Sequence, residues 1–189
     1  MEDTRGRLLS VALALFADRG YNAVGVQDVC DAAAVTKPTL YYRFGSKRGL
    51  LEAIAEERYA PFSAAVRARA RYSGDVASSL TGISAAFLES ARADRDFARL
   101  RLSLAFSPPA SEEHAVFRPR TEELYAAVTA LFEAASADHG NMRGRAAYYA
   151  ASFIGTADAY VGLLLADSLD PDTETVRRIV HYFMHGIFS

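Results

Sequence analysis

The chain has 189 residues and a mass of 20.5 kDa, and 51% of its residues are hydrophobic. This length fits one domain or a small domain joined to a larger one, and the apolar fraction is enough for a packed core, which excludes a disordered chain. The 21 basic and 23 acidic residues exclude a uniformly cationic surface, although a local basic patch remains open. The single cysteine, Cys30, excludes a disulfide framework. The first residues carry no secretory signal pattern, so we expect a cytoplasmic protein.

Hydrophobic periodicity predicts helices along the whole chain and no convincing strand. The expected helices span residues 4–19, 26–33, 37–44, 47–71, 76–93, 95–106, 111–138, 143–167 and 173–188. Gly20 is the expected end of the first helix, and Ser46 the expected N-cap of the fourth. The predicted fold class is all-α, with about nine helices. Short helices give way to long ones near Gly45, which predicts a three-helix head at residues 1–46 and a helical body at residues 47–189.

Residues 146–166 are numerous and apolar enough to span a bilayer, and Asp158 is their only charge. Small and polar residues dilute this segment, and an aspartate at the membrane centre costs about 3 kcal/mol. We therefore interpret the segment as the central helix of a bundle or a subunit interface, and predict no membrane contact.

Residues 26–44 have the pattern of a helix-turn-helix, in which two short helices are joined by a tight turn. Thr36 is expected to cap the second helix with its hydroxyl, and Pro38 fits the first turn of that helix. The residues expected to face inward are Val26, Val29, Cys30, Ala33, Leu40 and Phe44. The other side chains of the second helix are left for the opposite face.

Basic residues are concentrated around this second helix. Between Thr36 and Arg48 there are four basic residues and no acidic one, and the two lysines of the chain, Lys37 and Lys47, both lie there. Lysine suits phosphate, and the interleaved Tyr41 and Tyr42 can donate a hydroxyl to phosphate or contact a thymine methyl group. This pattern predicts a DNA-binding helix. The alternative is an exposed basic turn with two core tyrosines.

Four features of the N-terminal quarter to third of the chain form a recognisable combination. They are A-x-x-L-F-x-x-x-G-Y at residues 12–21, V-x-D-V at 26–29, A-A-V at 33–35, and T-K-P-T-L-Y-Y-R-F-G-S-K at 36–47 followed by two leucines at 50–51. The segment resembles the DNA-binding domain of the TetR (tetracycline-repressor) family of bacterial transcriptional regulators. The resemblance implies that base edges and phosphates are contacted by Thr36, Lys37, Pro38, Thr39, Tyr41, Tyr42 and Lys47.

Three positions depart from the family pattern. Ala34 stands where the family usually has Gly, which is tolerable if the backbone avoids a positive φ. Gly25 stands where a Ser or Thr usually caps the first helix of the motif and contacts phosphate, so we expect that contact to be lost. Gly49 replaces an acidic residue that is often present, which removes a capping-box partner for Ser46.

One helix-turn-helix reads few bases, so we expect a two-fold dimer that reads two half-sites. The last two helices carry small and apolar residues suited to a four-helix interface, as the resemblance implies. The predicted interface residues are Gly155, Asp158, Gly162, Ile179, Phe183 and Ile187. An intramolecular core is the alternative for the same faces.

The resemblance also implies a small effector bound in the helical body. Candidate lining residues are Tyr59, Phe62, Phe87, Phe97, Leu100, Leu104, Phe106, Phe117, Tyr125, Tyr148, Tyr149 and Phe153. Ordinary core packing is the alternative for each of them. Few charges interrupt these helices, which favours an apolar or aromatic effector.

No pattern indicates catalysis, a cofactor or a metal. His181 and His185 are four residues apart and can share a helix face, but no third ligand is evident, and Cys30 is expected in the core. We therefore predict a non-enzymatic, ligand-responsive homodimer, with repression favoured, that binds a palindromic operator and is released by an effector. The alternatives are a helical small-molecule-binding protein that has lost operator binding and a helical adaptor for a protein partner. The operator sequence, the effector and the regulated genes stay open.

Overall fold

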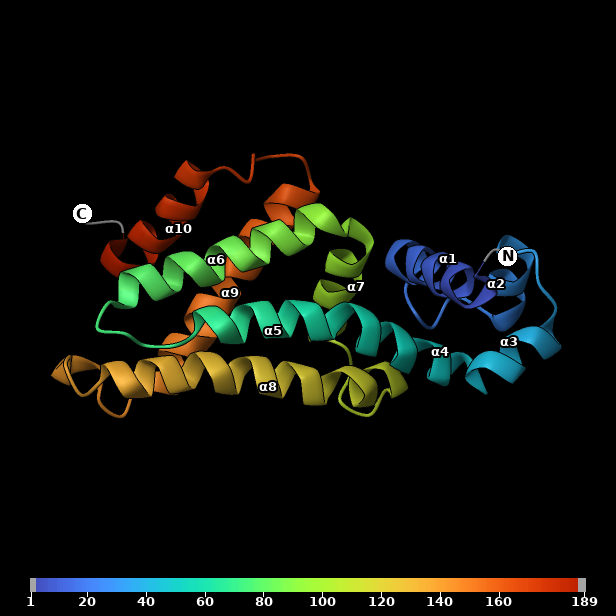
Figure 1. The fold of residues 1–189 in the computed structure, drawn as a ribbon, viewed down its shortest axis with the longest axis horizontal. Helices are drawn as coiled ribbons and strands as arrows, with labels where there is room; N and C mark the ends of the chain where they lie inside the picture. The colour runs from blue at the N-terminus through green and yellow to red at the C-terminus, as the bar shows by residue number, and fades with distance from the viewer. Residues whose placement is uncertain (1–2, 187–189) are drawn as a thin grey trace. The chain divides into compact units, whose positions relative to one another are not determined.

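The structure is a computed structural model and describes residues 3–186. All regular structure within these residues is helical (Figure 1). The elements are α1 (Thr4–Arg19), α2 (Val26–Ala32), α3 (Lys37–Phe44), α4 (Lys47–Ile54), a π-helix (Ala55–Tyr59), α5 (Ala60–Arg69), α6 (Val76–Ala93), α7 (Arg95–Ala105), α8 (Glu112–Ala135), a 3₁₀ turn (Gly140–Met142), α9 (Ala146–Leu165) and α10 (Thr173–His185). Because α4, the π-helix and α5 are continuous, residues 3–186 form nine helical rods. The all-α prediction is confirmed.

The chain divides into two compact units. Within the described residues, unit 1 comprises residues 3–60 and 96–119, and unit 2 comprises residues 61–95 and 120–186. The chain crosses between them after Ala60, Arg95 and Pro119. Helix irregularities accompany all three crossings: the π-helix, the break between α6 and α7, and a proline inside α8. The domain boundary after residue 46 remains a prediction; in packing, α4, α7 and the start of α8 group with residues 3–46.

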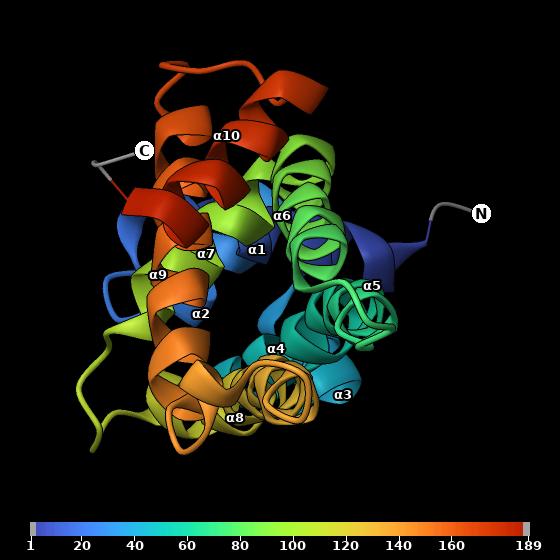
Figure 2. The same cartoon turned by 90° about the vertical axis from the view of Figure 1, so that its left-hand side faces the viewer.

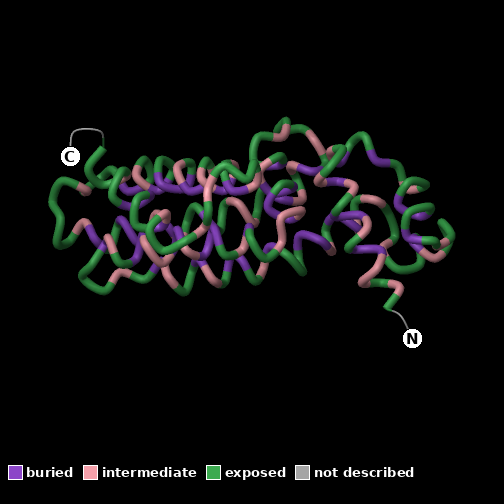
Figure 3. The backbone as a smooth tube through the Cα atoms, turned by 90° about the horizontal axis from the view of Figure 1, so that it is seen from above, coloured by how far each residue is buried: buried purple, intermediate pink, exposed green. Residues whose placement is uncertain are grey.

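Unit 1 has a core shared by α1, α2, α3 and α4. Its fully buried side chains include Leu8, Phe16, Val29, Leu40 and Leu50. The tube in Figure 3 shows how buried residues alternate with exposed ones along each helix. Two of the predicted caps are confirmed: Gly20 ends α1 with a φ of +82°, and the Ser46 hydroxyl oxygen accepts the Gly49 N–H at 2.9 Å at the start of α4. Both caps satisfy helix-end groups that would otherwise lack a partner.

Unit 2 is built around α6, which packs against α9 and α10. Figure 2 shows α6 nearly end-on, with α9 and α10 beside it. The aromatic centre of the group contains Phe153 and Phe183, whose ring centres are 5.1 Å apart, and Phe132, which is 6.3 Å from Phe183. Helix α9 is the segment with the membrane-like composition. Its apolar side is buried in this bundle, as the sequence favoured. Among residues 3–186, no helix combines the length and apolar character that crossing a membrane requires.

Candidate nucleic-acid interface

The predicted helix-turn-helix is formed by α2 and α3. Val29, Cys30 and Ala33 on one side of the turn and Leu40 on the other are at most 1% exposed. The two helices are therefore held together by a small apolar contact, which leaves the opposite face of α3 outside the core. Burial also raises the pKa of the Cys30 thiol, which suits the inert packing role expected for it.

The outer face of α3 carries cations and aromatic rings that are open to solvent. Tyr41 is 46% exposed and Tyr42 is 84% exposed, while Lys37 and Arg43 are also exposed. The Arg43 guanidinium lies 5.8 Å from the centre of the Tyr42 ring. Within residues 3–186 neither Lys37 nor Arg43 enters an ion pair. The alternative of a basic turn with two core tyrosines is therefore excluded.

The N-terminus of α3 is not capped as expected. Thr36 occupies the N-cap position with φ −92° and ψ 155°, but its side chain makes no capping hydrogen bond. Its Oγ1 instead lies 3.0 Å from Oγ1 of Thr39, because two hydroxyls three residues apart on the first turn can pair with each other. The expected cap is therefore wrong. The first N–H groups of α3 are left for an external acceptor, and a phosphate oxygen is the acceptor that a helix N-terminus favours.

Lys47 is half-buried, and most of its ammonium group is engaged within unit 1. Its Nζ donates to the carbonyl oxygens of Tyr21 at 2.9 Å and Val24 at 3.0 Å, and lies 4.1 Å from the centre of the Tyr21 ring. An ammonium group has three donors, so one is left for a phosphate. The phosphate contact implied by the resemblance stays a prediction, beside a structural role that the sequence did not indicate.

Tyr21 is held from the other side by the start of α8. Its hydroxyl donates to the Glu112 carboxylate, and the neighbouring Asn22 donates from Nδ2 to Oε1 of Glu113 at 2.7 Å. Burial raises the pKa of the Tyr21 phenol well above its usual range, and the hydrogen bond to Glu112 raises it further. Sequence reasoning missed these contacts because 91 residues separate the partners.

The sequence of the head matches a known family. The signature described as "Bacterial regulatory proteins, tetR family" covers residues 8–54. The chain is 35% identical over 88 residues to the HTH-type transcriptional activator FasR of Mycolicibacterium smegmatis, which covers 47% of this chain and 40% of that protein. It is 42% identical over 48 residues to the HTH-type transcriptional repressor KstR2 of Mycobacterium tuberculosis, covering 25% of this chain and 24% of that protein.

Residues 8–54 belong to the TetR family of bacterial regulatory proteins. The matched region spans less than half the length of these curated relatives. Solved structures extend the likeness of the fold beyond the matched segment. A TetR-family transcriptional regulator from Bordetella parapertussis superposes with a TM-score of 0.80 at 24% identity, covering 99% of this chain and 97% of that one. FadR from Bacillus subtilis in complex with stearoyl-CoA has a TM-score of 0.77 at 16% identity, covering 96% of this chain and 98% of that one. At these identities the structures show the shared fold alone.

The three departures from the TetR-family pattern have different structural consequences. Ala34 has a φ of +50°, so the condition for an unstrained alanine is not met. The Gly25 N–H donates to the Asp28 carboxylate at 2.6 Å, which satisfies the start of α2 from within that helix. A Cβ on Gly49 would overlap the carbonyl oxygen of Phe44, so the backbone itself requires glycine there.

Most of the residues predicted to line an effector site are buried in one unit or the other, and their lining role stays a prediction. Those that are buried are Tyr59, Phe62, Phe87, Phe97, Leu100, Leu104, Phe117 and Phe153. In unit 1, for example, Tyr59 packs edge-on against Phe97 and Phe117, with ring centres 5.9 and 6.0 Å apart. Phe106 is 92% exposed, because it follows the last turn of α7, so the lining role expected for it is wrong. Tyr125 and Tyr148 are also exposed, at 37% and 76%.

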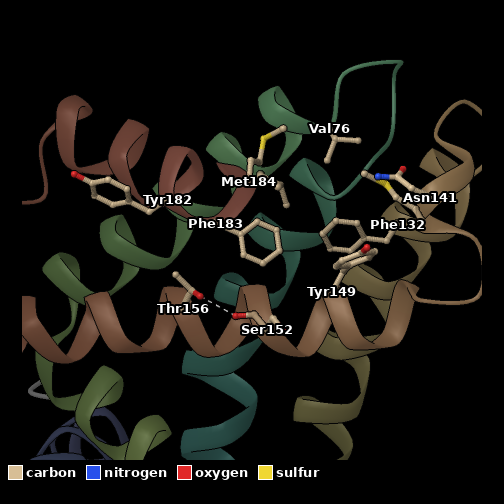
Figure 4. A pocket seen from close by; sticks show the side chains of 11 residues that line it. Val76, Phe132, Asn141, Tyr149, Ser152, Thr156, Tyr182, Phe183 and Met184 are labelled. Carbon is tan, nitrogen blue, oxygen red and sulfur yellow. Dashed lines mark hydrogen bonds between the residues drawn. The ribbon is translucent and has the colours of Figure 1, made fainter. Parts of the chain in front are cut away.

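Tyr149 does line a cavity of about 580 Å³ in unit 2 (Figure 4). The cavity is partly open to solvent and is lined by side chains of α6, α8, α9 and α10 and of the 3₁₀ turn. Its lining residues are Val76, Leu80, Phe132, Asn141, Met142, Tyr149, Ser152, Thr156, Tyr182, Phe183 and Met184. None of these side chains is charged, and the close-up shows the rings of Phe132, Tyr149 and Phe183 near one another, the ring of Tyr182 apart from them, and Ser152 and Thr156 below. The sequence missed most of this set because the lining is shared by four helices.

The predicted dimer residues fall into three groups. Gly155 is exposed and Gly162, Asp158 and Phe183 are half-buried, so all four can contribute to a second surface. Ile179 is fully buried within its own chain, because α10 packs this side against α6 and α9, so the interface role expected for it is wrong. Ile187 lies outside the described residues.

His181 and His185 lie side by side, but no third potential metal ligand joins them within residues 3–186. The ring centres of His181 and His185 are 4.9 Å apart on α10. No group of three or more potential metal ligands occurs within residues 3–186.

Proposed function

We propose that this chain is a homodimeric transcriptional repressor that places α3 of each protomer in the major groove of a palindromic operator. The observation that carries the proposal is the outer face of α3, where Lys37 and an 84%-exposed Tyr42 project from a TetR-family helix-turn-helix. An exposed tyrosine beside unpaired cations, on a helix whose other face is buried, suits contact with a duplex. Among the relatives, KstR2 is a repressor and FasR an activator, and we favour repression.

The outer sides of α9 and α10 support the dimer. Half of the exposed large apolar side chains in residues 3–186 lie on these two helices; they are Tyr148 and Leu163, and Tyr182 and Met184, which also border the open side of the cavity. Gly155 adds an open position on α9, since nothing lies within 4 Å of a Cβ placed there. A second copy of the helix pair can approach such a surface closely, and a self-complementary surface closes as a two-fold dimer.

The cavity of unit 2 is the proposed effector site. Its uncharged lining favours a neutral, apolar or aromatic molecule, and the hydroxyls of Ser152 and Thr156 offer a few polar contacts. The FadR structure from Bacillus subtilis holds stearoyl-CoA, so a long acyl chain belongs among the molecules to test. Binding would release the operator by favouring a state in which the two recognition helices no longer match the groove spacing.

The proposal is tested by DNA selection followed by matched substitutions. The full-length protein is used to select duplexes from a random pool, and the affinity for the selected duplex is measured by fluorescence anisotropy across salt concentrations. Lys37→Ala is expected to weaken binding about tenfold and to reduce the salt slope by about 2, because the dimer carries two copies of the lysine. Arg67→Ala is the control, since it removes an exposed cation from α5, where the guanidinium lies 3.9 Å from Glu123.

Tyr42→Ala is expected to weaken binding by a similar factor without changing the salt slope, because the side chain is neutral. If the wild-type protein selects no duplex over random DNA, the repressor proposal is refuted, and the small-molecule-binding alternative takes its place. If Lys37→Ala and Arg67→Ala have equal effects, α3 is not the reading helix.

A further inference from the structure

Outside the helix-turn-helix, two carboxylates at the start of α8 touch the segment that supports the recognition helix. We propose that Glu112 and Glu113 are positioning residues for DNA binding, which fix the orientation of α3 through Tyr21, Asn22 and Lys47. This inference rests on the proposed function, since it concerns how the same DNA-binding surface is held in place.

The contacts form an unbroken series within unit 1. The Glu112 carboxylate accepts the Tyr21 hydroxyl, and Oε1 of Glu113 accepts Nδ2 of Asn22 at 2.7 Å. The ring of Tyr21 covers the Lys47 ammonium at 4.1 Å, and the carbonyl oxygen of the same tyrosine accepts from Nζ at 2.9 Å. The start of α8 is therefore joined to the first residue of α4 through one tyrosine.

Lys47 is close in sequence to the end of the recognition helix. Only Gly45 and Ser46 separate it from Phe44, the last residue of α3. Ser46 is fixed by its cap on α4, so a displacement of Lys47 is passed to α3 through a short and constrained connection. A carboxylate 91 residues away in sequence can thereby set the direction in which Tyr41 and Tyr42 project.

The burial of Glu113 distinguishes this cluster from an ordinary surface contact. The residue is 4% exposed, and its Oε2 has no hydrogen-bond partner in the structure. An unsatisfied buried carboxylate oxygen is unfavourable for stability, so removing the group need not destabilise the fold by the full value of its one hydrogen bond. Its contact with Asn22 restricts orientation more than it adds stability.

A positioning role has a definite effect on affinity. The apparent dissociation constant rises in inverse proportion to the fraction of protein in the binding-competent orientation. A hydrogen bond from tyrosine to a carboxylate restricts that orientation, and its loss is expected to weaken operator binding about tenfold.

The chain offers a matched control for this bond. Tyr72 also donates its hydroxyl to a carboxylate, Oδ2 of Asp138, at 2.8 Å, and both residues lie in unit 2. Tyr21→Phe and Tyr72→Phe therefore remove the same chemical contact, one beside the DNA-binding helices and one elsewhere. Both proteins are titrated with the duplex that the wild type selects, well below their thermal midpoints.

We expect Tyr21→Phe and Glu112→Ala each to weaken binding about tenfold, Glu112→Gln to recover most of the loss because its amide oxygen still accepts, and Tyr72→Phe to leave affinity within about twofold. In a double-mutant cycle, Glu112→Ala and Lys47→Ala are expected to be less than additive in affinity, although the two residues do not contact each other. A merely structural contact predicts that Tyr21→Phe and Tyr72→Phe both keep the affinity of the wild type, because both are folded under these conditions, and that effects in the cycle are additive.

Three results overturn the inference. Unchanged or tighter binding by Tyr21→Phe refutes it alone, provided that Lys37→Ala still weakens binding. Equal losses in Tyr21→Phe and Tyr72→Phe refute it as well, because they show that the loss of affinity is not specific to the contact beside the DNA-binding helices. A wild-type protein that selects no duplex refutes the inference together with the proposed function.

Discussion

The replacement of Gly49 by alanine gives a sharp test of the turn between α3 and α4. In the TetR-family pattern an acidic residue often stands here, and its carboxylate would complete a capping box with Ser46. The structure instead indicates that any side chain at position 49 lowers the stability of the fold. A Cβ on Gly49 would overlap the Phe44 carbonyl oxygen and lie 3.2 Å from the carbonyl carbon, and neither backbone atom can turn away as a flexible side chain would.

The magnitude follows from three contributions. Relief of the overlap requires the turn to open, and overpacking of this kind costs about 1–3 kcal/mol. Opening the turn also weakens the hydrogen bond from the Gly49 N–H to Ser46, and a lost N-cap costs about 1 kcal/mol. The higher helix propensity of alanine offsets about 1 kcal/mol of this. We therefore expect a net destabilisation of about 1–3 kcal/mol.

The assay is chemical denaturation followed by circular dichroism, with thermal melting as a second measurement. For a chain of this size, each kcal/mol shifts the midpoint by about 2–4 °C. Gly82→Ala is the matched control, because its Cβ would meet side-chain atoms of Arg69 no closer than 3.3 Å and would overlap no backbone atom, so a small local shift suffices. Gly49→Glu is expected to destabilise as well, since its Cβ meets the same carbonyl before any gain from the capping box. If Gly49→Ala is as stable as Gly82→Ala, the reasoning about this turn is refuted.

Three further predictions concern single positions. Ala34→Gly should stabilise the fold by about 0.5–1 kcal/mol in urea denaturation, because glycine relieves the left-handed backbone at φ +50°, and an unchanged midpoint would show that this residue is unstrained. If α9 forms the dimer surface, Gly155→Ala should weaken self-association in sedimentation equilibrium. If Gly155 is instead exposed to solvent in the assembled protein, self-association should be unchanged, and the alanine should stabilise the helix by up to about 1 kcal/mol. Tyr21 has a folded pKa above its unfolded value of about 10, so its contribution to stability is complete below pH of about 10 and is lost as the pH rises through the folded pKa. Denaturation midpoints measured from neutral to alkaline pH should therefore fall less steeply in Tyr21→Phe than in the wild type.

Much of the local structure was predictable because its causes act within one helical turn. Gly20 and Ser46 end and begin helices through their own conformation and hydrogen bonds. The inward position of Leu40 and the outward position of Tyr42 follow from helical periodicity together with the turn chemistry of the motif. The TetR-family segment could be identified from the sequence for the same reason, since its motif is a set of closely spaced residues.

Tertiary packing decided the features that depend on distant parts of the chain. Whether Ile179 faces a partner or its own core depends on where α6 and α9 lie. Helical periodicity places it on an apolar helix face and does not indicate what covers that face. The sign of φ at Ala34 and the pairing of Thr36 with Thr39 depend on the path of the turn, which residue type alone leaves open. The contact of Tyr21 with Glu112 could be found only from the fold, because the sequence around either residue does not indicate a partner 91 residues away.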